Sequence, residues 1–197
     1  MSENLKAKTA KGVGWGFADN ILGLGITAAA NIILARILSP ADFGIIGMTA
    51  IFMTLSTSLV DSGFTGALTR KKDAVKADFD TVFYFNLAVS CLLYAVLFFC
   101  SPFIARFFKE PILVPVIRIL GISLVINAFG IVQKIILVRR IDFRTQAWIS
   151  LVSSFAAAVA AVAMAFYGFG VWSLVVLQVG KLAVNTILLW SVSKWHP

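Results

Sequence analysis

The chain has 197 residues and a net charge of +8; 60% of its residues are apolar and only 13% are charged. A soluble domain is about 45–50% apolar and about 25% charged, so this chain has too few charges to cover a water-facing surface. Composition therefore excludes a soluble enzyme and indicates a polytopic membrane protein.

Six apolar runs follow one another along the chain, each long enough to cross a bilayer as a helix of about 20 residues. They cover about residues 13–35, 43–64, 80–101, 113–137, 147–167 and 171–192. Charges, glycine or proline separate them, with Pro102 opening the third break. The last break is only residues 168–170 (GFG), which predicts a tight turn between antiparallel helices. We expect an all-α fold, a six-helix lobe over 13–192 with short tails at 1–12 and 193–197.

The distribution of lysine and arginine predicts the orientation of these spans. Eleven lie in the N-tail, the 70–78 and 138–146 loops and the C-tail, whereas three, Arg36, Arg106 and Lys109, lie on the opposite side. Positive charge is retained in the cytoplasm, so both termini are expected there. The net charge is thereby largely explained by topology, and no nucleic-acid partner is expected.

Rare residue types exclude the usual catalytic and metal centres. The single histidine, His196, is next to the C-terminus. Cys91 and Cys100 are nine residues apart in one predicted span, about 13 Å along a helix, which is beyond disulfide reach, so two buried free thiols are expected. Asp78 and Asp80 have the spacing of a metal–nucleotide motif in glycosyltransferases, but they precede an apolar helix whose N-terminal dipole favours acids. We expect no enzyme activity, metal ion or cofactor.

Polar residues inside spans tend to face a bundle interior or a wet cavity. Four spans carry such residues at helical spacing on one stripe. These are Gln178, Lys181 and Asn185 in the sixth span, Ser123, Asn127 and Lys134 in the fourth, Asn20, Thr27 and Asn31 in the first, and Asn86, Ser90 and Tyr94 in the third. The pattern predicts helices that line a shared hydrophilic cavity.

Lys181 is the strongest cavity candidate, because it lies near the middle of its span and cannot easily reach the headgroups. For Asn86, hydrogen bonding between helices is an equally good interpretation. Arg118 and Lys134 lie nearer to span ends, where a long cationic side chain can extend to the headgroups. Asp19 and Asp61, the two acids within spans, are candidates for ion coupling.

The fifth span differs from the others in its small residues. Two sets of small residues repeat at every fourth position: Ser150, Ser154 and Ala158, and Ser153, Ala157, Ala161 and Ala165. Small side chains at that spacing let helix backbones approach closely, so this span is expected to pack against neighbours on two sides.

Several segments resemble one family of exporters. They are residues 12–15 (GVGW) after the basic N-tail, 34–44 (LARILSPADFG), 61–64 (DSGF) and 70–73 (RKKD). In this order they are similar to the polysaccharide-transporter branch of the multidrug/oligosaccharidyl-lipid/polysaccharide exporter superfamily, nearest to the lipopolysaccharide, colanic-acid and teichuronic-acid exporters.

The resemblance implies a fold of two six-helix lobes around a central cavity, of which this chain would be the N-terminal lobe. Such a protein would reside in the bacterial inner membrane and move undecaprenyl-diphosphate-linked sugar repeats across it by alternating access. Its partners would be this anionic lipid-linked oligosaccharide, membrane lipids and a second lobe or C-terminal half. Cavities in the family tend to be cationic, which Lys181, Lys134 and Arg118 fit by residue type.

Three alternatives remain open at this stage. A relative with the same fold could export drugs or other small cations, for which acids in the cavity would be expected. The chain could instead be a non-transporting subunit that scaffolds a polysaccharide-assembly complex. A membrane glycosyltransferase would depend on Asp78 and Asp80 alone.

Overall fold

The computed structural model describes residues 21–60, 76–139 and 143–193, and within these ranges the chain is helical with no strand. The first helix is described over Ile21–Ile37. It is followed by α2 (Pro40–Val60), α4 (Lys76–Phe108), α5 (Leu113–Arg139), α6 (Phe143–Phe166) and α7 (Val171–Val192). Helices α2 to α7 are each long and apolar enough to cross a membrane. The predicted all-α membrane fold is thereby confirmed.

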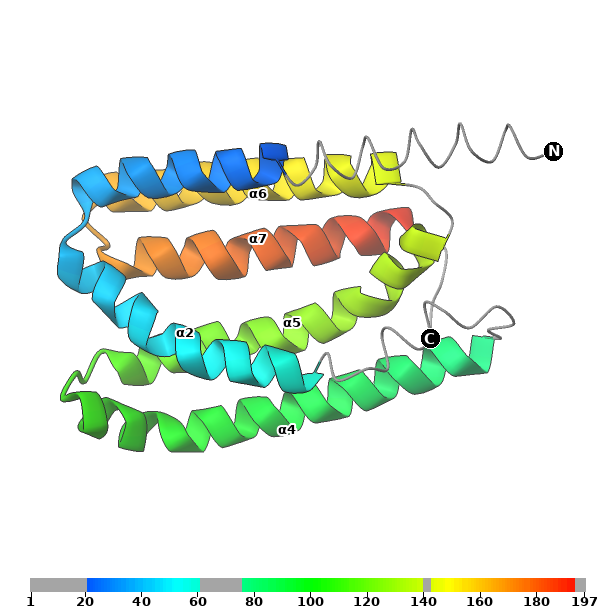
Figure 1. The fold of residues 1–197 in the computed structure, drawn as a ribbon, viewed down its shortest axis with the longest axis horizontal. Coiled ribbons are helices and arrows are strands. Elements are labelled where there is room, and N and C mark those ends of the chain that lie inside the picture. The colour runs from blue at the N-terminus through cyan, green and yellow to red at the C-terminus, as the bar shows by residue number, and fades with distance from the viewer. Residues whose placement is uncertain (1–20, 61–75, 140–142, 194–197) are drawn as a thin grey trace.

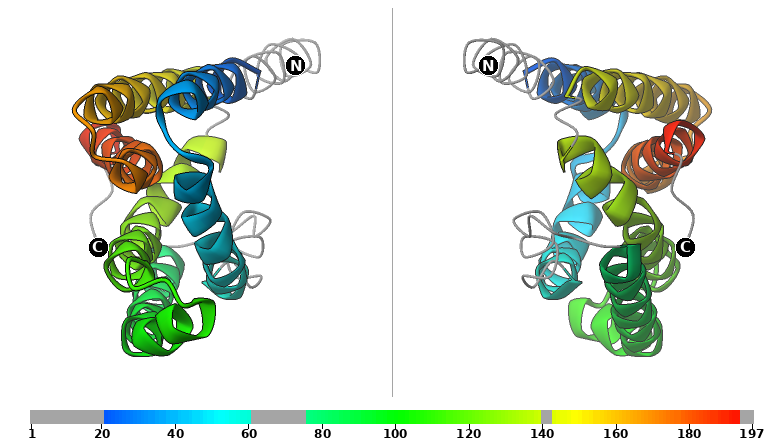
Figure 2. Two further views of the ribbon diagram at one scale, coloured as in Figure 1. Left: turned by 90° about the vertical axis from the view of Figure 1, so that its left-hand side faces the viewer. Right: turned by 90° about the vertical axis from the view of Figure 1, so that its right-hand side faces the viewer.

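Successive helices run in alternating directions (Figure 1). The first helix and α7 consequently run in opposite directions. The first helix lies beside α6, with α7 beneath them and then α5 and α4, while α2 crosses in front of α5 (Figures 1 and 2). The first helix and α2 meet at one end of the bundle and diverge toward the other.

Small residues let α6 pack closely on two sides. Ala157, Ala161 and Ala165 are buried in one cluster with Leu34 of the first helix and Leu174 of α7. Because α6 has a small residue at every fourth position, its backbone can approach those of the first helix and α7 closely. The two-sided packing predicted from the spacing is confirmed.

Helix α5 forms the centre of the bundle and packs most extensively against α4 and α7. At Gly121, a Cβ atom would lie only 2.9 Å from Cδ2 of Tyr94 on α4. At Gly130, it would lie 3.0 Å from Oγ1 of Thr186 on α7. At these two positions a larger residue would therefore meet a side chain of a neighbouring helix.

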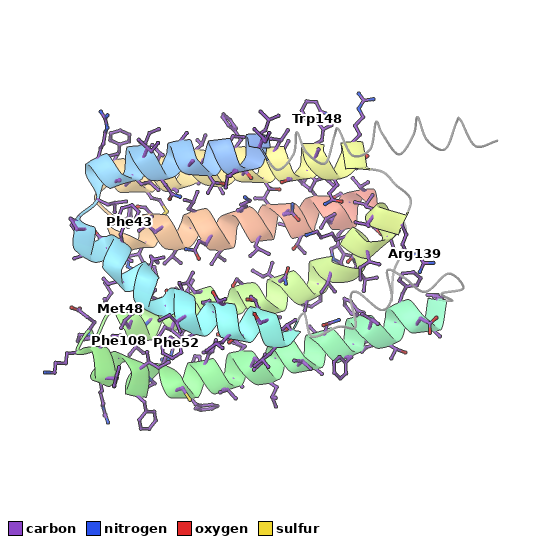
Figure 3. All side chains as sticks on the ribbon, in the orientation of Figure 1. Phe43, Met48, Phe52, Phe108, Arg139 and Trp148 are labelled. Carbon is purple, nitrogen blue, oxygen red and sulfur yellow. The ribbon has the colours of Figure 1, made fainter. Side chains whose placement is uncertain are left out.

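Helix α2 is held against the first halves of α5 and α7. Ile45 of α2 is buried with Leu120 of α5 and Val175 of α7. The ring of Phe52 meets that of Phe108, at the end of α4, edge to face with centroids 6.5 Å apart (Figure 3). These contacts leave the second halves of α5 and α7 uncovered by α2.

Two connections, from the first helix to α2 and from α6 to α7, are short and well capped. Ser39 Oγ donates to Asp42 Oδ2 at 2.7 Å, and the Asp42 amide donates back to Ser39 Oγ at 3.3 Å, so the pair caps α2 in both directions. Gly168 and Gly170 have φ values of 81° and 56°, a backbone region that suits glycine. The tight turn expected there joins α6 to α7.

Two features of α4 differ from the sequence expectation. The helix does not stop before Pro102 but continues to Phe108, so the residues taken as a break extend the helix. Cys91 and Cys100 are free, as expected, but both are exposed rather than buried. Hydropathy alone could not distinguish a lipid-facing thiol from a buried one, because both kinds of site are apolar.

Candidate functional site

The polar stripe predicted on the last span runs through the middle of α7 and remains accessible. Gln178 is exposed, and Lys181 and Asn185 are half-buried. The cluster that includes Ile45 of α2 reaches along α7 from Val171 to Val179, so Lys181 and Asn185 lie beyond it.

Lys181 faces the first helix. Its Nζ donates to Oγ1 of Thr27 at 3.4 Å, and the Thr27 hydroxyl in turn donates to the carbonyl of Gly23 at 2.8 Å. Asn31, one turn after Thr27, is exposed on the same side of that helix. The stripes of the first helix and α7 thus meet at Thr27 and Lys181, two residues 154 positions apart in the chain.

The α5–α7 pair has a groove on one side. This apolar groove of about 560 Å³ is lined by Ile126 and Phe129 of α5 and by Ala183, Thr186, Ile187, Trp190 and Ser191 of α7. Its polar side chains are already bonded to backbone: Thr186 Oγ1 donates to Ile126 O at 3.3 Å, and Trp190 Nε1 donates to Phe129 O at 2.9 Å. The groove therefore offers little to a polar ligand.

Asn127 and Lys134 lie on the opposite side of this helix pair. On α5, Ile126 and Gly130 contact Thr186 of α7, and at about 100° per residue Phe129 and Asn127 flank that line on opposite sides. Lys134 follows Asn127 by seven residues and shares its side. On α7, Asn185 and Ile187 flank the contact line in the same way, so Asn127 and Asn185 lie on the side away from the groove.

We name this surface the polar face: Thr27 and Asn31 of the first helix, Asn127 and Lys134 of α5, and Gln178, Lys181 and Asn185 of α7. In Figure 1 the first helix and α2 diverge in front of α7 and α5, the two helices that carry five of these residues. Among the described residues, no carboxylate forms an ion pair with Lys181 or Lys134. The face combines two cations that have no described counter-charge with amides and a hydroxyl, which suits an anionic ligand with many hydroxyl groups.

Two candidates from the sequence lie elsewhere. Asn86 is completely buried, with its Nδ2 donating to the carbonyl of Val82 on its own helix at 2.9 Å. Arg118 lies on the groove side of α5, where its Nε donates to Ser101 Oγ of α4 at 3.2 Å. Their positions favour roles in helix packing rather than in the polar face.

The acidic candidates are only partly described. Asp19, Asn20 and Asp61 lie outside the described residues. Asp78 lies in the first turn of α4, as the dipole argument expects. Within the described ranges, no group of three or more His, Cys, Asp or Glu residues could hold a metal ion.

Sequence reasoning missed two buried polar contacts between helices. One is Gln133, completely buried in α5 beside Phe129 and Trp190. The other is the contact of Arg118 with Ser101, in the turn before Pro102. A glutamine within a span and a serine directly before a helical proline were the available signals.

The described helices are those of a multi-pass membrane protein. The chain belongs to the polysaccharide biosynthesis protein family, whose model matches residues 33–197. The polysaccharide-exporter membership predicted from the motifs is thereby confirmed.

Named relatives agree with this family. The chain is 30% identical over its whole length to the succinoglycan biosynthesis transport protein ExoT of Rhizobium meliloti, and covers 40% of that protein. It is 30% identical over 71% of its length to the teichuronic acid biosynthesis protein TuaB of Bacillus subtilis, and 21% identical over 71% to the lipopolysaccharide biosynthesis protein WzxC of Escherichia coli. It covers 29% and 28% of these two. No solved structure matches the chain.

Proposed function

We propose that the chain forms one lobe, the N-terminal one, of a flippase for lipid-linked sugar repeats in polysaccharide biosynthesis. The cargo is a sugar repeat on undecaprenyl diphosphate, which moves from the cytoplasmic to the outer leaflet of the bacterial inner membrane. Both termini are cytoplasmic in this proposal. The names of the relatives, which describe transport and polysaccharide biosynthesis rather than catalysis, support it.

The observation that carries the proposal is the position of Lys181. The residue lies near the middle of α7, half-buried, and its one described polar contact is with the neutral Thr27 hydroxyl. An ammonium at this depth is expensive unless a counter-charge or water reaches it. A diphosphate would supply that counter-charge, and low-dielectric surroundings would strengthen the attraction.

Alternating access requires a second lobe. Repeat-built carriers expose a midplane site by moving one bundle against another. Within the described ranges the polar face has helices on only one side, and the chain spans 28–40% of the length of its relatives. We therefore propose that a second six-helix lobe covers the polar face and completes the cavity.

A chimera tests this function. The chain replaces the matching region of the succinoglycan transport protein, and the chimera is expressed in a strain that lacks that protein. We expect surface polysaccharide to be restored, and to be lost again with Lys181→Ala while the amount of chimera in the membrane is unchanged. A membrane-inserted chimera that restores no polysaccharide, or that works equally well with Lys181→Ala, contradicts the proposal.

A further inference from the structure

Pro102 lies inside α4 and interrupts its hydrogen bonding. The helix continues for six more residues to Phe108. Proline has no N–H, so the carbonyl of Phe98, four residues earlier, has no backbone donor at this position. In an apolar environment an unpaired carbonyl is costly and is usually satisfied by a nearby hydroxyl or another helix.

Ser101 supplies the missing donor. Its Oγ donates to the carbonyl of Phe98 at 2.8 Å, and the side chain is completely buried. The serine hydroxyl thus takes the place of the amide that Pro102 lacks.

Arg118 of α5 contacts both Ser101 and Phe98. Its Nε donates to Ser101 Oγ at 3.2 Å, and its Cζ lies 4.0 Å from the centre of the Phe98 ring. No carboxylate in the described ranges pairs with Arg118. The guanidinium therefore gains a hydrogen-bond acceptor and an aromatic face from α4, in a geometry that a lysine cannot reproduce.

The segment after the break contacts α2. Phe108 packs edge to face on Phe52 of α2, and both belong to the apolar cluster that fixes α2 on α5 and α7 (Figure 3). Helix α2 borders the polar face. The break in α4 therefore connects Arg118, through the contact of Phe108 with Phe52, to a helix beside the candidate site.

We propose that Ser101, Pro102 and Arg118 form a clamp that holds the end of α4, and with it α2, in the described position. When Arg118 leaves Ser101, the segment Phe103–Phe108 can pivot at Pro102 and carry α2 relative to the first helix. Arg118 is then a positioning residue that acts through α4 rather than a residue that touches the cargo. The clamp follows from contacts between helices and is independent of the molecule transported.

Distances between spin labels test the clamp in the full chain, reconstituted in nanodiscs with Cys91 and Cys100 replaced by serine. Labels at Ile32→Cys of the first helix and Leu55→Cys of α2, both exposed positions, report the distance between these two helices. We expect one narrow distribution, broadened by Ser101→Ala and by Arg118→Ala. Ser90→Ala is the control, because Ser90 is equally buried on α4 and its hydroxyl has no hydrogen-bond partner in the described part of the chain.

Adding Pro102→Ala makes the test specific. An alanine at position 102 again donates an N–H to the Phe98 carbonyl, so Ser101→Ala should broaden the distribution only while Pro102 is present. Ser101→Ala should likewise lower the thermal midpoint by about 3 °C or more in the presence of Pro102 and by clearly less with Pro102→Ala, where only the contact with Arg118 is lost. Equal effects in both backgrounds, or no effect in either, would overturn the clamp.

Arg118→Lys separates the clamp from simple anchoring at the headgroups. Lysine keeps the charge but loses the planar fork. The clamp predicts that Arg118→Lys behaves as Arg118→Ala does. A narrow distribution with Arg118→Lys would overturn the proposal and leave Arg118 as a membrane-surface anchor.

Discussion

Nζ of Lys181 in α7 lies 3.4 Å from Oγ1 of Thr27 in the first helix. The contact joins the last helix of the bundle to the first and brings together polar stripes that are far apart in sequence. Because the Thr27 hydroxyl proton is directed to Gly23 O, its lone pairs are free to accept from the ammonium. Thr27 thus orients Lys181 without neutralising it.

Replacing Thr27 by valine should weaken transport moderately. Valine keeps the shape but removes the acceptor, and a typical hydrogen bond contributes about 0.5–1.5 kcal/mol, or roughly 2- to 10-fold in rate. The measurement is export of polysaccharide in the chimera. Thr57→Val on α2 is the matched control, because the Thr57 hydroxyl likewise donates to backbone carbonyls of its own helix but lies outside the polar face. Equal activity of the two variants would show that Lys181 needs no orientation by Thr27.

Replacing Gly121 by alanine should destabilise the bundle. The new Cβ would lie 2.9 Å from Tyr94 Cδ2, and overpacking of this kind costs about 1–3 kcal/mol. Gly44→Ala on α2 is the control, since nothing lies within 4 Å of its Cβ position. The thermal midpoint of the purified protein should fall for Gly121→Ala and stay level or rise for Gly44→Ala. A midpoint unchanged by Gly121→Ala would mean that Tyr94 moves freely, contrary to close packing of α4 on α5.

The sequence predicted the helices well because each is an apolar run bounded by charges or turn residues. It also predicted the packing of α6, because a repeat of small residues at every fourth position has one steric consequence. The stripe of Lys181 and Asn185 was visible for a similar reason, since helical spacing alone puts both residues on one side.

The sequence could not predict which side of a helix meets lipid and which meets protein. In a membrane both surroundings are apolar, so Asn86 and Arg118 were grouped with Lys181 although their neighbours on α4 and α5 hold them elsewhere. Pro102 was taken as a helix end for a related reason. Its effect depends on Ser101 and Arg118, and the contact with Arg118 arises only once α4 and α5 are packed together.

The orientation of the spans can be measured by chemical labelling. Single cysteines at positions 72, 109 and 140, in a background without Cys91 and Cys100, are treated from outside with a thiol reagent that cannot cross the membrane. The asymmetry of lysine and arginine predicts reaction at position 109 only. Reaction at 72 or 140 but not at 109 would reverse the orientation and put both termini outside.

The 197-residue chain should not transport when expressed alone. Without a second lobe the polar face would meet hydrocarbon, and a lysine near the bilayer centre costs about 2.5–3.5 kcal/mol on insertion scales. Complementation of a flippase-deficient strain measures this, first with the chain alone and then with a second lobe. Surface polysaccharide restored by the chain alone would mean that six helices are sufficient.

The most direct test of the central claim is movement of a labelled diphosphate-linked lipid across proteoliposomes that contain the complete transporter with this lobe. We predict that Lys181→Ala slows movement roughly 10- to 100-fold, since a hydrogen bond to a charged group is worth about 1.5–3 kcal/mol. Lys181→Arg should keep most of the activity, and Lys76→Ala, an exposed lysine outside the polar face, should keep all of it. Movement at the unmodified rate with Lys181→Ala would contradict a cationic polar face that binds the diphosphate.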